Sequence, residues 1–208
     1  DEISSSGSNS SDFIPTFPTL YTPSLISQAT GVYPEGHGII SNSTLDRDSG
    51  ELNDSPSDLS ILSAEPIWTT VKRQGMSVLV HDWPFSQEQP AEHGADIFLS
   101  EYDASLSDQA RLDALMAAWT GHSGEKKLRL VMGSLRDLEK AGFENGSKAD
   151  GTYEAVSKLD STLKTFFDQL REKWPTLRGK DGDKLYVILS TDHGMADCEK
   201  VIHFGELM

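Results

Sequence analysis

Short apolar runs alternate with longer stretches of helical periodicity along this chain, and that alternation limits its fold more than any other feature. Three runs predict buried strands: Met76–Val80, Leu128–Met132 and Lys184–Ser190. Apolar residues at helical spacing predict helices over Ser107–Trp119 and Tyr153–Trp174, with a serine at the N-cap of the first. This order indicates an α/β protein, a three-layer α/β/α sandwich around a mostly parallel sheet.

The first half of the chain adds two shorter helices and one polar segment. Helices are expected over Pro23–Thr30 and Glu65–Gln74, because each is followed by a glycine that can end it. Residues 1–12 are rich in Ser, Gly, Asn and Asp, which predicts a flexible N-terminal segment. Residues 13–208 have the length of a single domain with ample material for a core.

Acidic residues outnumber basic ones by 33 to 18, which gives a formal charge of −15. This balance argues against a nucleic-acid-binding surface, which needs a basic patch, and against an anionic membrane surface. It does not argue against a small phosphate ester, because bound metal ions reverse the local field. No apolar run approaches the length of a membrane span. The one cysteine, Cys198, excludes a disulfide within these residues and a cysteine-based metal site.

All four asparagines, Asn9, Asn42, Asn53 and Asn145, lie in Asn-X-Ser/Thr triplets. These triplets are acceptors for N-glycosylation, which fits an exported protein. Because the chain is rich in Ser and Thr, chance also produces such triplets.

An adjacent Asp and His, Asp192 and His193, follow the third predicted strand. In open α/β sheets, ligands and metals gather at the carboxyl ends of strands. Such a pair can supply one oxygen and one nitrogen ligand to a zinc-like ion. For two residues alone, the alternative is a surface turn with an incidental histidine. Further motifs elsewhere in the chain are needed to distinguish a metal site from such a turn.

Four motifs occur in an order that resembles one enzyme family. The longest spans Phe17–Asn42, and it is followed by Glu65–Trp68 with a later glycine, Asp82–Pro84 and Thr191–Met195. Together they resemble the type I phosphodiesterase/nucleotide pyrophosphatase family of the alkaline phosphatase superfamily, over roughly residues 13–208. The resemblance implies an alkaline-phosphatase-like fold, hydrolysis of phosphoric esters and an extracytoplasmic location.

The resemblance also implies two zinc-like ions, a Thr or Ser hydroxyl that attacks phosphorus, and an Asn amide that stabilises the developing charge. Asn42 matches that asparagine, although a turn asparagine is the alternative. The matched nucleophile position holds Tyr21, and Thr22 is the next residue. We rank Thr22 first, Tyr21 second and Thr16, in a Thr-Phe-Pro motif, third. His37, in the same region, is interpreted as a structural residue that fixes the loop.

The metal ligands of the family are matched only in part. Asp192 and His193 match two ligands of one site. At the second site the family has an Asp and a His four residues apart, and here Glu139 and Phe143 stand at those positions. A glutamate can bind zinc and a phenylalanine cannot. Asp137 is an alternative ligand, although a solvated charge is its other interpretation.

The remaining ligands of the family are expected outside these 208 residues. The family's first strand, which ends in a metal-binding Asp followed by Gly, should precede residue 1. Its final His ligand should follow Met208, because the spacing of His203 is wrong. Missing segments of a longer chain are therefore expected to complete the protein.

Three interpretations follow from these matches. The first is a divalent-metal phosphodiesterase that acts on a small phosphate ester or a nucleotide-like substrate. The second is a catalytically inactive family member that acts as a binding or structural protein, and Tyr21 and Phe143 favour it. The third is an internal piece of a longer enzyme, and the ligands missing at both ends favour it. A fold alone does not decide between them, because function depends on the site.

Overall fold

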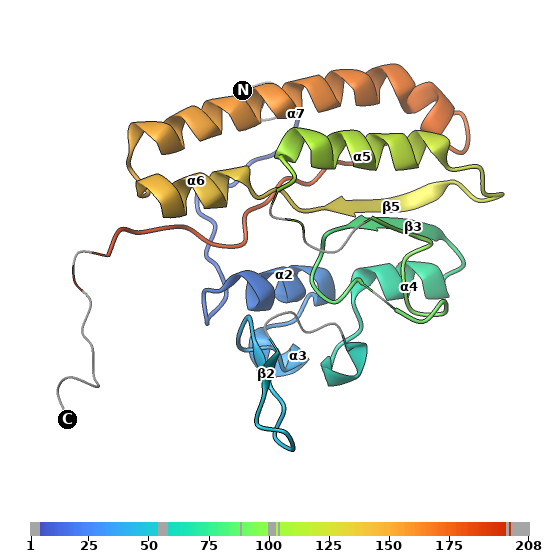
Figure 1. Cartoon of the computed structure of the whole chain (residues 1–208). Coiled ribbons are helices and arrows are strands. Elements are labelled where there is room, and N and C mark those ends of the chain that lie inside the picture. Colours follow the sequence, from blue (N-terminus) through green and yellow to red (C-terminus); the bar gives the residue numbers. More distant parts are fainter. Residues whose placement is uncertain are drawn as a thin grey trace.

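The computed structural model describes residues 5–53, 58–87, 89–99, 103, 105–198 and 200. Its centre is a parallel sheet with the strand order β4–β3–β5 (Figure 1). β3 (Ser77–His81) pairs with β4 (Ile97–Leu99) and with β5 (Leu128–Gly133). Every residue of β3 is buried, as expected for the middle strand of a sheet that is covered on both faces.

Helices cover both faces of this sheet (Figure 1). One layer contains α5 (Asp108–Gly121), α6 (Asp137–Asn145) and α7 (Asp150–Leu177). The other contains α2 (Tyr21–Thr30), α3 (Pro34–His37) and α4 (Ile67–Arg73). A short hairpin of β1 (Thr44–Leu45) and β2 (Leu52–Asn53) and the 3-10 turn Leu59–Ile61 lie between α3 and α4 in the chain. The predicted three-layer α/β/α architecture is confirmed.

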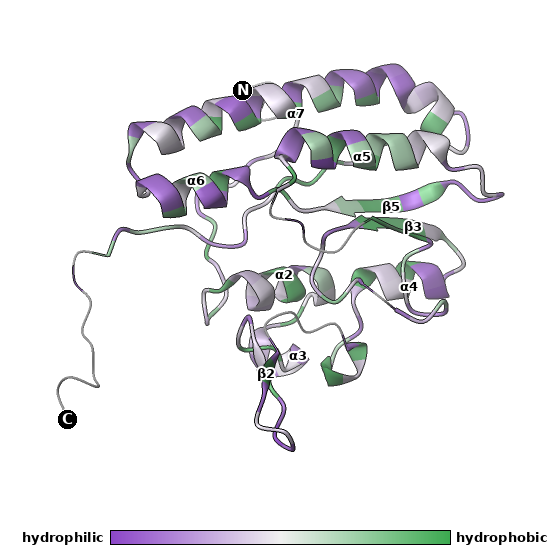
Figure 2. Ribbon diagram, viewed as in Figure 1, coloured by the Kyte–Doolittle hydropathy of each residue, from purple (hydrophilic) through white to green (hydrophobic). Residues whose placement is uncertain are grey.

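Two hydrophobic cores lie on the two faces of the sheet. Because side chains alternate along a strand, Val78 and Val80 belong to one core and Leu79 to the other. The first core also contains Ile26, Ala29, Ile39, Trp68 and Phe85. The second also contains Leu115, Met116, Trp119, Leu128, Leu170 and Leu177. Figure 2 shows apolar residues along the strands β3 and β5, which lie between the two cores, and many hydrophilic residues on α7.

Local signals predicted two of the helix ends correctly, the start of α5 and the end of α2. Ser107 caps α5, and its hydroxyl accepts a hydrogen bond from the amide of Ala110 at 3.3 Å. Gly31 ends α2 with a φ of 72°, in the left-handed region that favours glycine. α2 begins at Tyr21, earlier than predicted, and α7 extends beyond both of its predicted ends. Within the described ranges, no helix is long and apolar enough to cross a membrane.

The prediction of a buried strand over Lys184–Ser190 is wrong for this structure. These residues form no helix or strand and all are exposed, with 81% of Tyr186 and 90% of Ile188 accessible to solvent. Apolar and β-branched residues form a strand only where another strand pairs with their backbone. Here a cavity of about 960 Å³ is lined by residues of both β5 and this segment, and no backbone ladder joins the two.

Candidate functional site

Most of the predicted site residues gather around this cavity of about 960 Å³. Its lining comes from α2, β5, α6 and α7 and from the segment Tyr186–Met195. Tyr21, Glu139, Asp192 and His193 are among the lining residues. The fold therefore brings the start of α2, helix α6 and the C-terminal segment to one place.

Asp192, His193 and Glu139 come together, and we call them the acid–histidine cluster. His193 Nε2 lies 3.3 Å from Asp192 Oδ2 and 4.0 Å from Glu139 Oε1. His193 Nδ1 lies 2.9 Å from the carbonyl oxygen of Gly194. Because a carbonyl oxygen only accepts, Nδ1 carries the proton of a neutral ring and Nε2 has the free lone pair. Metal-binding histidines are commonly held in this way, with the second ring nitrogen donating to a backbone carbonyl.

The acid–histidine cluster fits a divalent cation in its chemistry and in one of its two spacings. Two ligand atoms on one tetrahedral zinc ion lie about 3.3 Å apart, given metal–ligand bonds of about 2.0–2.1 Å. The 3.3 Å between His193 and Asp192 matches that spacing, and the 4.0 Å between His193 and Glu139 is longer. No three His, Cys, Asp or Glu side chains in the described part of the chain lie close enough together to hold a metal ion. The cluster is thus a pair of suitable ligands, Asp192 and His193, with a second carboxylate, that of Glu139, nearby.

The other metal-ligand candidates have different surroundings. Asp137 Oδ2 accepts a hydrogen bond from the amide of Asp108 at 3.3 Å and lies 3.4 Å from Lys158 Nζ. The Asp137 carboxylate is therefore already paired with the first amide of α5 and with a lysine. Phe143 is 75% exposed. His203 lies outside the described residues. A second cluster of ligands is therefore not found in the described ranges.

Tyr21, at the matched nucleophile position, is the first residue of α2. The guanidinium carbon of Arg136 lies 3.7 Å from the centre of its ring, and its hydroxyl lies 3.3 Å from Ser134 Oγ. Burial raises the pKa of Tyr21 to about 12, although Arg136 and the hydrogen bond to Ser134 act in the opposite direction. A phenol with this pKa is neutral at physiological pH, which makes it a weak nucleophile.

Thr22 and Asn42 are joined by a hydrogen bond. The backbone amide of Thr22 donates to Asn42 Oδ1 at 2.9 Å. Because Oδ1 accepts this bond, the Nδ2 group is the donor that Asn42 can offer to a ligand. Asn42 is exposed, whereas Thr22 is only 6% exposed and lines neither of the two cavities described here.

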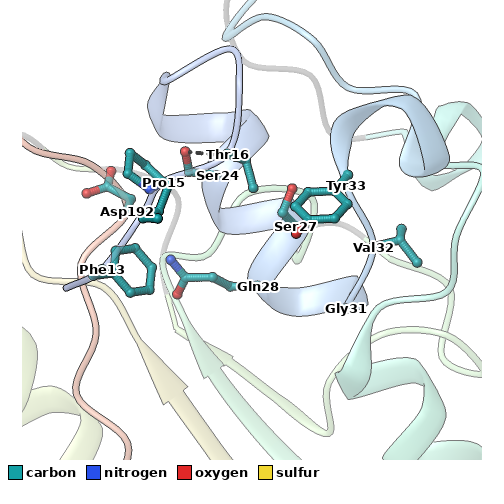
Figure 3. Close-up of a pocket in the computed structure, with 11 residues that line it drawn as sticks. Phe13, Pro15, Thr16, Ser24, Ser27, Gln28, Gly31, Val32, Tyr33 and Asp192 are labelled. Carbon is teal, nitrogen blue, oxygen red and sulfur yellow. Dashed lines mark hydrogen bonds between the residues drawn. The ribbon is translucent and has the colours of Figure 1, made fainter. Parts of the chain in front are cut away.

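Thr16 lies in a second, smaller cavity of about 310 Å³ (Figure 3). The walls of this cavity come from Phe13–Thr16, α2 and Tyr33, and Asp192 also reaches it. Thr16 Oγ1 lies 3.5 Å from Ser24 Oγ. The three ranked hydroxyls therefore have three different surroundings, and Asp192 lines both cavities.

His37 has the structural role that its place in the motif predicted. It is fully buried at the end of α3. Its Nδ1 accepts from the amide of Ile39 at 3.1 Å, so Nε2 carries the proton and donates to Ser27 Oγ at 2.9 Å. Burial lowers the pKa of His37, which keeps the ring neutral. The side chain thereby ties the loop after α3 to α2.

A buried ion pair beside the site was not predicted from the sequence. Asp82 directly follows β3 with a positive φ of 48°, and its Oδ2 lies 2.5 Å from Arg111 Nη1 on α5. The two side chains are only 8% and 1% exposed. Burial raises the pKa of Asp82, and the charges of Arg111 and Arg136 oppose that shift. The motif Asp82–Pro84 was the only sequence signal for this pair, because Arg111 belongs to no motif.

Comparison with known proteins assigns the chain to a family. The whole chain, residues 1–208, matches the family model of type I phosphodiesterase / nucleotide pyrophosphatase. Ectonucleotide pyrophosphatase/phosphodiesterase family member 1 of Homo sapiens is 27% identical over 97% of this chain and 22% of its own length. An uncharacterised pyrophosphatase/phosphodiesterase of Schizosaccharomyces pombe is 25% identical over 88% of this chain and 37% of its own length.

A solved structure shows the same fold. Murine ectonucleotide pyrophosphatase / phosphodiesterase 5, an inactive variant in complex with AMP, superposes with a TM-score of 0.66 at 20% identity. The superposition covers 76% of this chain and 42% of the murine chain. At this identity the likeness concerns the fold. The chain thus spans well under half the length of these proteins.

Proposed function

Since this chain belongs to the type I phosphodiesterase/nucleotide pyrophosphatase family, we propose that it forms part of a metal-dependent phosphoric ester hydrolase with a small phosphate ester or a nucleotide as substrate. The observation that carries this proposal is the meeting of Glu139, Asp192 and His193 beside Tyr21 in one cavity. These residues come from α2, α6 and the C-terminal segment, so only the folded chain brings them together. The AMP complex of the murine protein supports a nucleotide-like substrate.

Asp192, His193 and Glu139 are the residues that would hold the cation. Zinc is proposed because one imidazole and two carboxylates are among its usual ligands. A bound divalent cation supplies Lewis-acid polarisation of phosphoryl oxygens. The carbonyl of Gly194 engages Nδ1 of His193, which leaves Nε2 as the ring nitrogen that would bind the cation. With two close ligands and a third at 4.0 Å from His193, we expect weak binding.

Thr22 is the proposed nucleophile, and Asn42 is the proposed donor to the developing negative charge. The hydrogen bond from the Thr22 amide to Asn42 holds these two residues together, which supports Thr22 over Thr16. The phenol of Tyr21 is bulkier than a threonine hydroxyl and would crowd the phosphate, which supports Thr22 over Tyr21. Because Thr22 is buried, neighbouring side chains must move before its hydroxyl reaches an ester. We therefore expect slow turnover.

A binding protein without catalysis is the second candidate, and two observations favour it. Tyr21 fills the matched nucleophile position with a neutral phenol. Phe143 stands exposed at a position where the family has a histidine ligand. A chain of this kind would keep the binding of a phosphate ester and lose its hydrolysis.

We also propose an extracytoplasmic location. The relatives from Homo sapiens and Bos taurus are named as ectonucleotide enzymes. Asn42, Asn53 and Asn145 are exposed, as acceptors of glycans have to be. Expression in a glycosylating secretory host should yield a product whose mass falls on treatment with a glycosidase, and an unmodified product would count against export.

Hydrolysis of bis(4-nitrophenyl) phosphate, measured together with the metal content of dialysed protein, tests the proposed function. We expect weak zinc binding that Asp192→Asn abolishes, and low activity that Thr22→Ala abolishes. Asp160→Asn, the same change at an exposed position of α7, should behave as the wild type. Full activity in Thr22→Ala together with loss of activity in Tyr21→Phe would show that Tyr21, and not Thr22, is the nucleophile.

Two further outcomes would change the proposal. Binding of AMP without any turnover would establish the second candidate, a binding protein. Two zinc ions that survive dialysis would contradict the ligand assignment, because the acid–histidine cluster offers too few ligands for two closed sites.

A further inference from the structure

Gln28 lies in α2 and lines both cavities. Figure 3 shows it among the residues of the smaller one. Its Nε2 donates to the carbonyl oxygen of Thr191 at 2.9 Å, and its Oε1 accepts from Ser190 Oγ at 2.8 Å. The two bonds use opposite ends of the side-chain amide, so they fix its orientation. Both partners directly precede Asp192 in the chain.

A second group of contacts holds the same segment from the side of α6 and α7. Asp197 Oδ1 accepts from the amide of Ser147 at 2.7 Å. The sulfur of Met195 packs against Gly142, and a Cβ at that glycine would overlap the sulfur. The two cluster residues of this segment therefore lie between an attachment to α2 and an attachment to the α6–α7 region.

The segment depends on such attachments because it has no regular secondary structure of its own. Residues 184–198 form no helix or strand. Ordering such a chain costs conformational entropy. If the chain were not anchored beforehand, this entropy loss would occur on binding and would weaken the affinity for a cation. Contacts that orient metal ligands without touching the metal typically change its affinity by about 10–100-fold.

We infer that Gln28 is a positioning residue for the acid–histidine cluster, because its amide holds the backbone that leads directly into Asp192. It acts through that segment and touches neither carboxylate of the cluster in the contacts given above. The inference rests on the proposed function insofar as the cluster binds a cation. The anchoring itself needs no metal, so it can be tested separately.

Two variants separate anchoring from general stability. Gln28→Met keeps the size of the side chain and removes both hydrogen bonds, whereas Gln28→Glu keeps the acceptor for Ser190 and loses the donor for Thr191. Gln74→Met, at the exposed end of α4, is the matched control. In metal-free protein, hydrogen–deuterium exchange is measured at the amide of His193, which donates to the neighbouring carboxylate at 2.9 Å. Titration with Co²⁺ alone then measures affinity and the visible spectrum of the bound ion.

We expect Gln28→Met to raise the exchange rate of this amide about tenfold, since it loses two hydrogen bonds. Co²⁺ should bind about tenfold more weakly and with a changed spectrum. Gln28→Glu should have an intermediate effect and Gln74→Met none, while the amides of the central strand β3 exchange less than about tenfold faster in Gln28→Met. Unchanged exchange of the His193 amide in Gln28→Met, or an equal rise at His193 and at the β3 amides, would overturn the inference.

The two measurements also distinguish this inference from the proposed function. A wild type that binds no Co²⁺, but whose His193 exchange depends on Gln28, would overturn the metal site and support the anchoring role. Wild-type Co²⁺ affinity and spectrum in Gln28→Met would overturn the positioning role and leave the metal site in place.

Discussion

Ile188 offers a direct test of what fills the larger cavity. Its side chain is 90% exposed, and it lines the cavity together with Tyr186, Leu189 and residues of β5. Among the described strands β5 pairs only with β3, so one row of its backbone groups has no strand beside it. An unpaired strand edge next to a run of strand-forming residues predicts that another β-strand occupies this space. We propose that this strand comes from chain outside these 208 residues, in a longer parent protein; the alignment with the human relative covers 22% of that relative's length.

The expected cost of removing the Ile188 side chain follows from its exposure. Covering the 90% that is now exposed would be worth about 2 kcal/mol. Ile188→Ala should therefore lower the free energy of unfolding of the parent protein by about 2–4 kcal/mol, including the cavity that it leaves. In the 208-residue chain the same substitution should change that free energy by less than about 0.5 kcal/mol, because the side chain is at the surface.

Urea unfolding followed by tryptophan fluorescence measures both values. Ile40→Ala is the matched control, because Ile40 is 66% exposed and lines neither cavity. Equal costs for the two substitutions in the parent protein would refute the reasoning. A dimer of the 208-residue chain that protects Ile188 would instead assign the strand to a second copy.

Three further predictions concern the site. Arg111→Met should cost about 3–5 kcal/mol in urea unfolding at neutral pH, because the buried Asp82 carboxylate loses its nearest counter-charge. That loss should shrink as the pH falls: a carboxyl group whose pKa is raised by folding binds its proton more tightly in the folded state, so acid favours folding. Tyr21 should contribute no phenolate absorbance below about pH 11, given its pKa of about 12, and difference spectra against Tyr21→Phe measure this. Gly142→Ala should weaken Co²⁺ binding in titrations, because its Cβ overlaps the Met195 sulfur, and Met195→Ala in the same chain should restore binding.

Two helix ends could be predicted from the sequence, because local groups determine them. Ser107 caps α5 through its own hydroxyl, and Gly31 ends α2 through its own backbone conformation. The run Lys184–Ser190 is different. Its apolar residues favour an extended backbone, but a strand also needs the N–H and C=O groups of a second strand. The described strands offer no such partner to this run, so the pattern predicted a tendency that the fold does not satisfy.

The acid–histidine cluster was predictable to the extent that motifs carry it. Asp192 and His193 are adjacent, and Glu139 follows from the spacing of the family; the fold brings Glu139 Oε1 to 4.0 Å from His193 Nε2. Arg111 could not be predicted in the same way. An arginine in an amphipathic helix has the pattern of a solvated charge, and it is buried here because Asp82 lies opposite it at the end of β3.

The nucleophile shows why a matched position does not by itself identify a reacting group. Counting back from Gly31 assigns that position to Tyr21, but a hydroxyl attacks phosphorus only if it can be ionised and can reach the ester. Burial raises the pKa of Tyr21, while Arg136 and Ser134, which follow β5, act against that shift. Access limits Thr22, whose side chain is buried. Both conditions depend on side chains that pack against α2 from elsewhere in the chain. The motif therefore names the candidates, and the packing around α2 determines which of them can act.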